Sequence, residues 1–130
     1  METKMTFAPK DPVVWTEIRM SDLVKATAFY GTVLQNGMRI TTDMGPTPMA
    51  VFPAAEQSGV AGNLVEGTHA APGTGNIIHL AIPDTLAEVR KRVIAAGSTA
   101  SDDDMTIPSG TFFYASDPDG KTTGFYRPKG

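Results

Sequence analysis

The sequence predicts an α+β fold made of two β-α-β-β-β modules, because one pattern of strand, cap and helix occurs twice. Each copy opens with a strand of alternating residues, at 13–20 and at 76–82. An aspartate that can cap a helix follows each strand, Asp22 in the first copy, where Ser21 is the alternative cap, and Asp84 in the second. This repetition indicates two similar units, each with a helix on one side of its strands and an open face on the other.

The first copy spans residues 13–65. Apolar residues at spacings of three and four predict a helix over residues 23–34. This helix is predicted to end near Gln35 to Gly37, where Asn36 and Gly37 accept positive φ easily. Further strands of the first copy are expected at residues 38–42, 49–52 and 59–65.

A connector over residues 66–75, rich in Gly, Ala and Thr, leads to the second copy at residues 76–127. A second helical stripe of apolar residues ends at Gly97. The segment D-P-D-G at residues 117–120 is predicted to be a tight turn. Further strands of the second copy are expected at residues 99–107, 110–116 and 122–126.

The composition fits a single domain of 130 residues, long enough to bury a core without disulfides or metals. The chain contains no cysteine, which excludes thiolate chemistry and zinc–thiolate sites. It has no run of about 18 apolar residues and no apolar stretch of a signal peptide at its start, so we expect a cytoplasmic protein that does not bind membranes. The net charge of −3, with one short basic run at residues 90–92, makes nucleic acid a poor candidate partner.

The opening strands carry the candidate site residues. On the first strand Trp15, Glu17 and Arg19 share one face, opposite the face that suits a core. A ring, a carboxylate and a guanidinium together are typical of a cavity wall. Glu17 and His79 each lie five residues before the cap aspartate of their copy, so they occupy equivalent places in the two modules.

Several short motifs point to one family. The chain reads S-D-L-x-x-A-x-x-F-Y at residues 21–30, A-A-G at 95–97, I-P-S-G at 107–110 and D-P-D-G at 117–120. Together they resemble the vicinal oxygen chelate superfamily, the glyoxalase, bleomycin-resistance and extradiol-dioxygenase group, over about residues 13–127. The resemblance implies that the two modules form a curved half-barrel around a cavity, often within a homodimer.

The resemblance also implies where a metal would be bound. Metal enzymes of this superfamily place one ligand seven residues before the cap aspartate of each half and a glutamate in the final strand. Here these positions hold Trp15, Ile77 and Gly124, whose side chains cannot ligate a divalent ion. The fourth ligand would come from residues 59–65, where Asn63 is the main polar candidate. We therefore expect no cofactor, and a divalent metal at displaced residues is the alternative.

Glu17 and His79 are the candidate catalytic pair, acting as acid and base or as displaced metal ligands. The pattern does not indicate which aromatic residues of 112–114 face the cavity. His69 lies in the connector, where we expect no catalytic role. Further residues in register with the open faces are expected to contact a ligand: Trp15, Arg19, Thr122 and Tyr126.

Three functions remain open, and the preferred one is binding of a small organic molecule without a metal, as in bleomycin-resistance-like proteins. The second is a lyase or isomerase, similar to lactoylglutathione lyase, that acts on a carbonyl compound through Glu17 and His79. The third is an interaction module whose exposed sheet builds an assembly. Whether the protein is an enzyme is therefore left open by the sequence.

Overall fold

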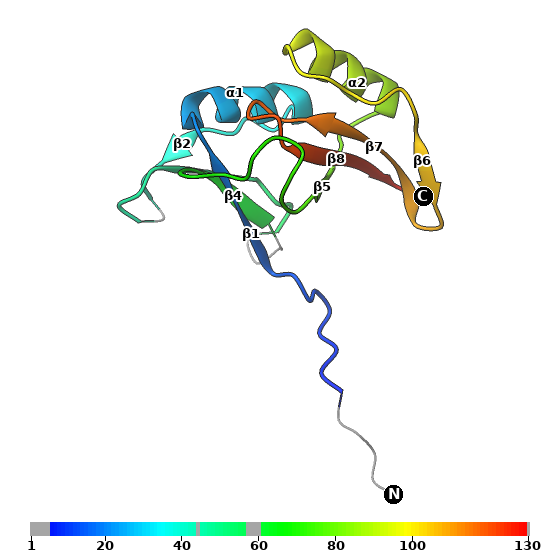
Figure 1. Cartoon of the computed structure of the whole chain (residues 1–130). Helices are drawn as coiled ribbons and strands as arrows, with labels where there is room; N and C mark the ends of the chain where they lie inside the picture. Colours follow the sequence, from blue (N-terminus) through cyan, green and yellow to red (C-terminus); the bar gives the residue numbers. More distant parts are fainter. Residues whose placement is uncertain (1–5, 44, 57–60, 130) are drawn as a thin grey trace, which may run out of the picture.

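Two four-stranded sheets, each with one helix, make up the fold (Figure 1). The structure, a computed structural model, describes residues 6–43, 45–56 and 61–129. The first module contains β1 (Trp15–Met20), α1 (Leu23–Leu34), β2 (Ile40–Thr41), β3 (Met49–Val51) and β4 (Ala61–Glu66). The second module contains β5 (Ile78–Ala81), α2 (Leu86–Ala95), β6 (Met105–Ile107), β7 (Gly110–Ser116) and β8 (Thr122–Pro128). The connector that joins them covers residues 67–77 in the structure, compared with the predicted 66–75.

Both sheets have the same topology. The strand order is β1-β4-β3-β2 in the first sheet and β5-β8-β7-β6 in the second. β1 pairs in parallel with β4, and β5 pairs in parallel with β8, whereas the other pairs are antiparallel. Within the described ranges no strand pairing joins β1 to β5, so both remain edge strands of their sheets. The α+β class and the repeated β-α-β-β-β order of elements along the chain are thus confirmed.

Helix α1 begins and ends where the sequence predicts. The Asp22 side chain accepts a hydrogen bond from Lys25 N at 3.0 Å and caps the helix. At the other end Gln35 already adopts the left-handed conformation, with φ of 52°. Gln35 lies within the predicted end at residues 35–37, but positive φ is unusual for a glutamine, and the sequence favoured Asn36 and Gly37 for this conformation.

Helix α2 corrects a prediction, because Thr85 caps it and Asp84 does not. The Thr85 hydroxyl accepts a hydrogen bond from Glu88 N at 3.2 Å. Asp84 instead accepts two hydrogen bonds from the Arg92 guanidinium, at 3.1 and 2.8 Å. These bonds hold the pKa of Asp84 below its usual value. Threonine is also a good cap residue, and its place one residue later leaves Asp84 free to pair with the arginine.

Both helices cover the same side of the sheets, and the core lies between the helices and the strands (Figure 1). Its largest fully buried side chains come from both modules and include Met20, Tyr30, Leu64, Phe113 and Phe125. The Tyr30 hydroxyl lies 3.0 Å from the Thr123 hydroxyl and so connects α1 to β8. Burial raises the pKa of Tyr30, so this hydroxyl stays protonated. We call the opposite side of each sheet its open face.

Some strands are shorter than predicted. The strand expected over residues 99–107 is reduced to β6, and Ala100 contributes an isolated bridge to Ala115. The strand expected over residues 38–42 is reduced to β2. The first two residues of the strand expected at 59–65 lie outside the described residues.

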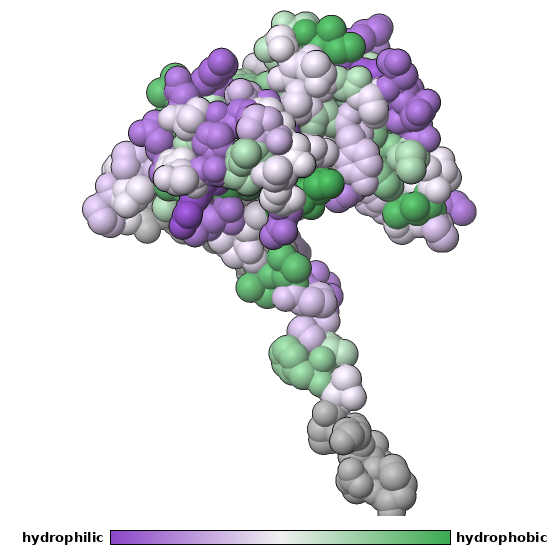
Figure 2. Space-filling model, viewed as in Figure 1, coloured by the Kyte–Doolittle hydropathy of each residue, from purple (hydrophilic) through white to green (hydrophobic). Residues whose placement is uncertain are grey.

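Residues 6–14 precede β1 as an arm without helix or strand, and Figure 2 shows it extending from the body of the protein. Val14, which the alternation placed on the core face, belongs to this arm and is 67% exposed. The strand therefore begins two residues later than its pattern suggests. No helix in the part of the chain that the structure describes is long and apolar enough to cross a membrane.

Candidate functional site

The open face of β1 carries three of the residues predicted for the site. Trp15, Glu17 and Arg19 alternate with residues that are half-buried or buried, as the period of a strand requires. All three side chains are exposed, whereas Met20 at the end of the strand is fully buried. The first module therefore presents an aromatic ring and two opposite charges on one open wall.

Trp15 is held by a hydrogen bond to β4. Its Nε1 donates to Asn63 Oδ1 at 2.8 Å, while Asn63 itself is only 1% exposed. The Nδ2 of this amide has no partner among the described residues. Asn63 lies beside Glu17 in the register of β4 and β1. The indole N–H and the amide oxygen thus satisfy each other at this point of the wall.

His79 lies differently on the equivalent wall of the second module. It is paired in register with Gly124 of β8, and a Cβ at this glycine would lie 2.4 Å from His79 Nδ1. The imidazole therefore covers the glycine. Its ring also packs edge-on against Phe112 and Tyr114, with centroids 4.8 and 5.7 Å away. Phe112 and Tyr114 thus share the open face with His79, whereas Phe113 is fully buried in the core.

Tyr126 and Thr122 lie on the same face of β8 as Gly124. The Tyr126 hydroxyl donates a hydrogen bond to Ser109 Oγ at 2.8 Å, so it is engaged with the β6–β7 hairpin. Thr122 is half-buried and pairs in register with Ser116 of β7. Neither residue lines either of the two hollows described next.

A groove of about 650 Å³ runs between β1 and β5, and we call it the inter-module groove. It is lined from the first module by Val13, Thr16, Ile18, Leu34, Asn36, Phe52, Pro53, Ala61 and Gly62, and from the second by Ile77, Ile78, His79, Leu80, Ala81, Ile82 and Pro83. Most of these side chains are apolar, and His79 is one of the few polar groups. The volume and this mixture are typical of a small-molecule site.

A second hollow of about 400 Å³ lies between β1 and the connector, and we call it the connector hollow. It is lined by Thr16, Glu17, Ile18, Arg19, Thr68, His69, Ala70, Thr74, Gly75, Asn76, Ile78 and Lys121. Glu17 and His79, the predicted catalytic pair, therefore line different hollows. Within the described ranges no hydrogen bond or ion pair joins them.

The residues at the superfamily's metal positions do not fit a metal ion. The amide oxygen of Asn63 is occupied by Trp15, and the place of a side chain at Gly124 is filled by the His79 ring. Ile77 offers only an alkyl group. In the described part of the chain, no three His, Asp or Glu side chains lie close enough together to hold a metal.

Sequence reasoning missed the part that the connector and the 117–120 turn play in the site. Ser21 N donates to Asp119 at 2.8 Å, so the turn is fastened to the end of β1. Burial raises the pKa of Asp119, but the hydrogen bonds from Ser21 outweigh it and hold the pKa below its usual value. The same turn places Lys121 against the backbone oxygen of Arg19. These contacts join residues about 100 positions apart, and no local pattern indicates them.

Comparison with known proteins gives structural relatives only. No family model matches the sequence, and no curated protein matches it. The fosfomycin resistance protein FosX from Listeria monocytogenes has 18% identity and a TM-score of 0.68, with 94% of each chain covered. A mutant of that protein, solved with Mn(II) and 1S,2S-dihydroxypropylphosphonic acid, has 19% identity and a TM-score of 0.65, with 92% of this chain and 90% of that chain covered.

A glyoxylase/bleomycin resistance protein/dioxygenase domain from Frankia sp. EAN1pec is also similar, with 15% identity and a TM-score of 0.63. The match covers 93% of this chain and 100% of that chain. At such identities the similarity is one of fold. The chain has the fold of the vicinal oxygen chelate superfamily, as its sequence motifs led us to expect.

Proposed function

We propose that the protein binds a small organic molecule in the inter-module groove without using a metal. The observation that carries the proposal is the groove itself, because both modules contribute to its largely apolar wall. A modest molecule can bury most of its surface in a groove of this size. His79 supplies a polar group that can orient the molecule.

The free edges of β1 and β5 add backbone groups to this groove. Each strand pairs on one side only, with β4 and β8 respectively, so its other side presents N–H and C=O groups. A ligand with a carbonyl or hydroxyl group could bond these edges. Such contacts fix orientation, while the apolar walls contribute most of the affinity.

The metal-free part of the proposal rests on the residues at the superfamily's ligand positions. An indole, an alkyl group and a glycine supply no donor, and the fourth position is already hydrogen-bonded to the indole. A lyase or isomerase that uses Glu17 and His79 remains the alternative. It requires both groups at one substrate, and the two side chains line separate hollows.

A thermal-shift screen of small aromatic and carbonyl compounds tests the proposal, because a ligand of the folded state raises the apparent melting temperature. Ala81→Trp fills the groove, whereas Ala87→Trp places the same side chain on an exposed position of α2. We expect the compounds that stabilise the protein to lose their effect in Ala81→Trp alone, and to keep it in the presence of EDTA. Equal shifts in both variants would rule out the groove as the site. The homodimer remains a prediction, to be checked by sedimentation.

A further inference from the structure

Two side chains of the connector hollow carry opposite charges. Glu17 and Arg19 lie two residues apart on the open face of β1, so their Cα atoms are about 6.6 Å apart. Within residues 6–43, 45–56 and 61–129, neither charged group forms an ion pair. They also form no hydrogen bond to each other there. Both charges are therefore available to a ligand.

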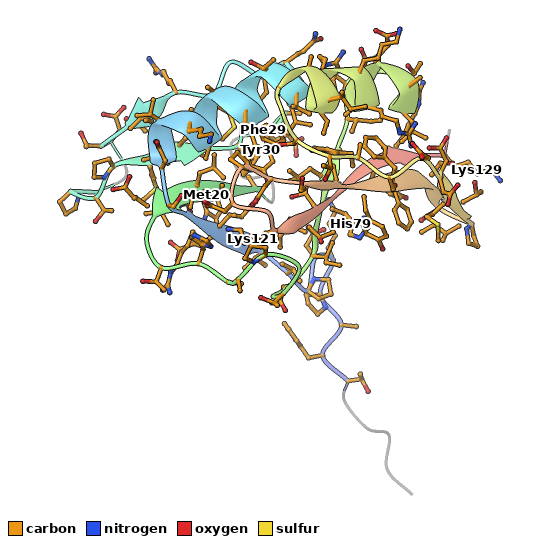
Figure 3. All side chains as sticks on the ribbon, turned by 45° about the horizontal axis from the view of Figure 1, so that its top comes forward. Met20, Phe29, Tyr30, His79, Lys121 and Lys129 are labelled. Carbon is orange, nitrogen blue, oxygen red and sulfur yellow. The ribbon has the colours of Figure 1, made fainter. Side chains whose placement is uncertain are left out.

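The position of Arg19 is fixed from two sides. Its aliphatic stem lies across Gly67, because a Cβ at this glycine would be 3.5 Å from Arg19 Cδ. Its backbone oxygen accepts a hydrogen bond from Lys121 Nζ, and Figure 3 shows Lys121 close to the blue ribbon of β1. The guanidinium is thus carried on a supported stem at the wall of the hollow.

The other charged groups of the hollow already have partners. Lys121 Nζ lies 3.6 Å from Asp117 Oδ2. His69 Nδ1 donates to the Ala70 carbonyl at 2.7 Å, because a carbonyl oxygen can only accept. This leaves His69 Nε2 at 3.6 Å from Asp119 Oδ1. Among the described residues, the charges of this hollow that have no partner are therefore the two on β1.

We propose that the connector hollow binds a small amino carboxylate, with its carboxylate on Arg19 and its ammonium on Glu17. A simple anion would be attracted by Arg19 and repelled by Glu17. A simple cation would be attracted by Glu17 and repelled by Arg19. A ligand that carries both charges is attracted by both groups. Arginine is well suited to a carboxylate because its guanidinium can donate two parallel hydrogen bonds.

The remaining lining suits this class of ligand. Thr68, Thr74 and Asn76 bring hydroxyl and amide groups from the connector. A volume of about 400 Å³ is at the small end of the range for ligand pockets. The hollow therefore fits a compact polar molecule, in contrast to the larger and more apolar inter-module groove.

Isothermal titration with glycine, β-alanine and 4-aminobutyrate tests the site, with propionate and n-propylamine as analogues that carry one charge each. We expect at least one amino carboxylate to bind saturably, and the analogue of matching length to bind about tenfold more weakly or worse. In Glu17→Gln we expect the amino carboxylate to bind no more tightly than propionate. In Arg19→Gln we expect the amino carboxylate to bind no more tightly than n-propylamine.

Two matched controls carry the same chemical changes outside the hollow. Glu56→Gln and Arg39→Gln alter exposed charges that do not line it, and both should bind like the parent protein. Ala81→Trp, which fills the inter-module groove, should leave amino carboxylate binding unchanged, so this site and the proposed function fail independently. The proposal is overturned if no amino carboxylate binds, if propionate or n-propylamine binds as tightly, or if Glu17→Gln and Arg19→Gln bind like their controls.

Discussion

The two modules have the same topology, yet their open walls carry different chemistry. In the first module, Asn63 of β4 reaches Trp15, and Glu17 beside it is exposed. In the second module the equivalent of Asn63 is Gly124, which has no side chain, and the His79 ring lies over it. The first wall is thus charged and open, while the second is aromatic and packed.

This difference shows how a single position controls its neighbour across a parallel strand pair. On β4 the side chain of Asn63 occupies the space beside Glu17, so Glu17 points away from the sheet. On β8 the glycine Gly124 leaves this space empty, so the ring of its neighbour His79 lies against the sheet. Glu17 and His79 occupy equivalent sequence positions, but one faces the connector hollow and the other the inter-module groove. Equivalent spacing therefore does not imply a shared site.

The largest expected effect comes from giving the second module the side chain it lacks. In Gly124→Ala the new Cβ would lie 2.4 to 2.8 Å from atoms of the His79 ring, so the ring must move. We expect a loss of about 2–3 kcal/mol in the free energy of unfolding, measured by urea denaturation, as for other overpacked positions.

A double variant isolates the cause of that loss. If the imidazole is the obstacle, Gly124→Ala in a His79→Ala background should cost less than about 1 kcal/mol, and the two changes should couple. A cost that is unchanged when the ring is removed would show that His79 does not cover the glycine.

A smaller effect is expected at the equivalent place in the first module. Trp15→Phe removes the donor to Asn63 Oδ1 and leaves the buried amide without any partner, so we expect a loss of about 1–2 kcal/mol in urea denaturation. Asn63→Leu removes the whole amide, including the Nδ2 that has no described partner, and should change stability by less than about 1 kcal/mol. The reverse order of the two costs would contradict the role given to this hydrogen bond.

The helix starts of the two modules should respond differently to the same change. Asp22→Ala removes the cap of α1 and should cost about 1 kcal/mol, with faster hydrogen exchange at the Lys25 amide. Thr85→Ala should do the same at the Glu88 amide of α2. Asp84→Ala should leave the Glu88 amide protected, and faster exchange there would show that Asp84 caps the helix after all.

The smallest expected effect is a pH dependence at Asp84. Hydrogen bonds from Arg92 lower its folded pKa, so the stability it contributes is present above the unfolded value of about 3.9 and is lost as the pH falls through the folded pKa. The stability advantage of the parent over Asp84→Asn should therefore shrink between pH 5 and pH 3 in urea titrations. An advantage that grows on acidification would contradict this sign.

Much of the fold could be predicted from the sequence, because local patterns determine it. Strand alternation, helical spacing and the aspartate–proline turn gave the order of the elements and the open face of β1. The sequence assigns the cap of α2 to Asp84 because this residue holds the place of Asp22 in the first copy, whereas the competing pair with Arg92 lies eight residues away. The first and last residues of the strands could not be predicted from the pattern, because pairing with a neighbouring strand decides where each strand ends.

Less of the site could be predicted, because its walls depend on contacts between distant residues. Alternation placed Glu17 and Arg19 on one face, but only the folded connector shows which hollow they enter. His69 was set aside as a connector residue, and the structure gives it a hydrogen bond and a place in that hollow. The position of the His79 ring follows from Gly124, about 45 residues later, which a pattern along one strand cannot reveal.

The most direct test of the central claim is a titration of the purified protein with Mn(II), Ni(II), Zn(II) and Fe(II), followed by the groove ligand found in the thermal-shift screen. We predict no stoichiometric metal binding, and the same affinity for the ligand with and without EDTA. One divalent ion bound per chain and lost in His79→Ala, together with ligand binding that requires it, would contradict the metal-free account.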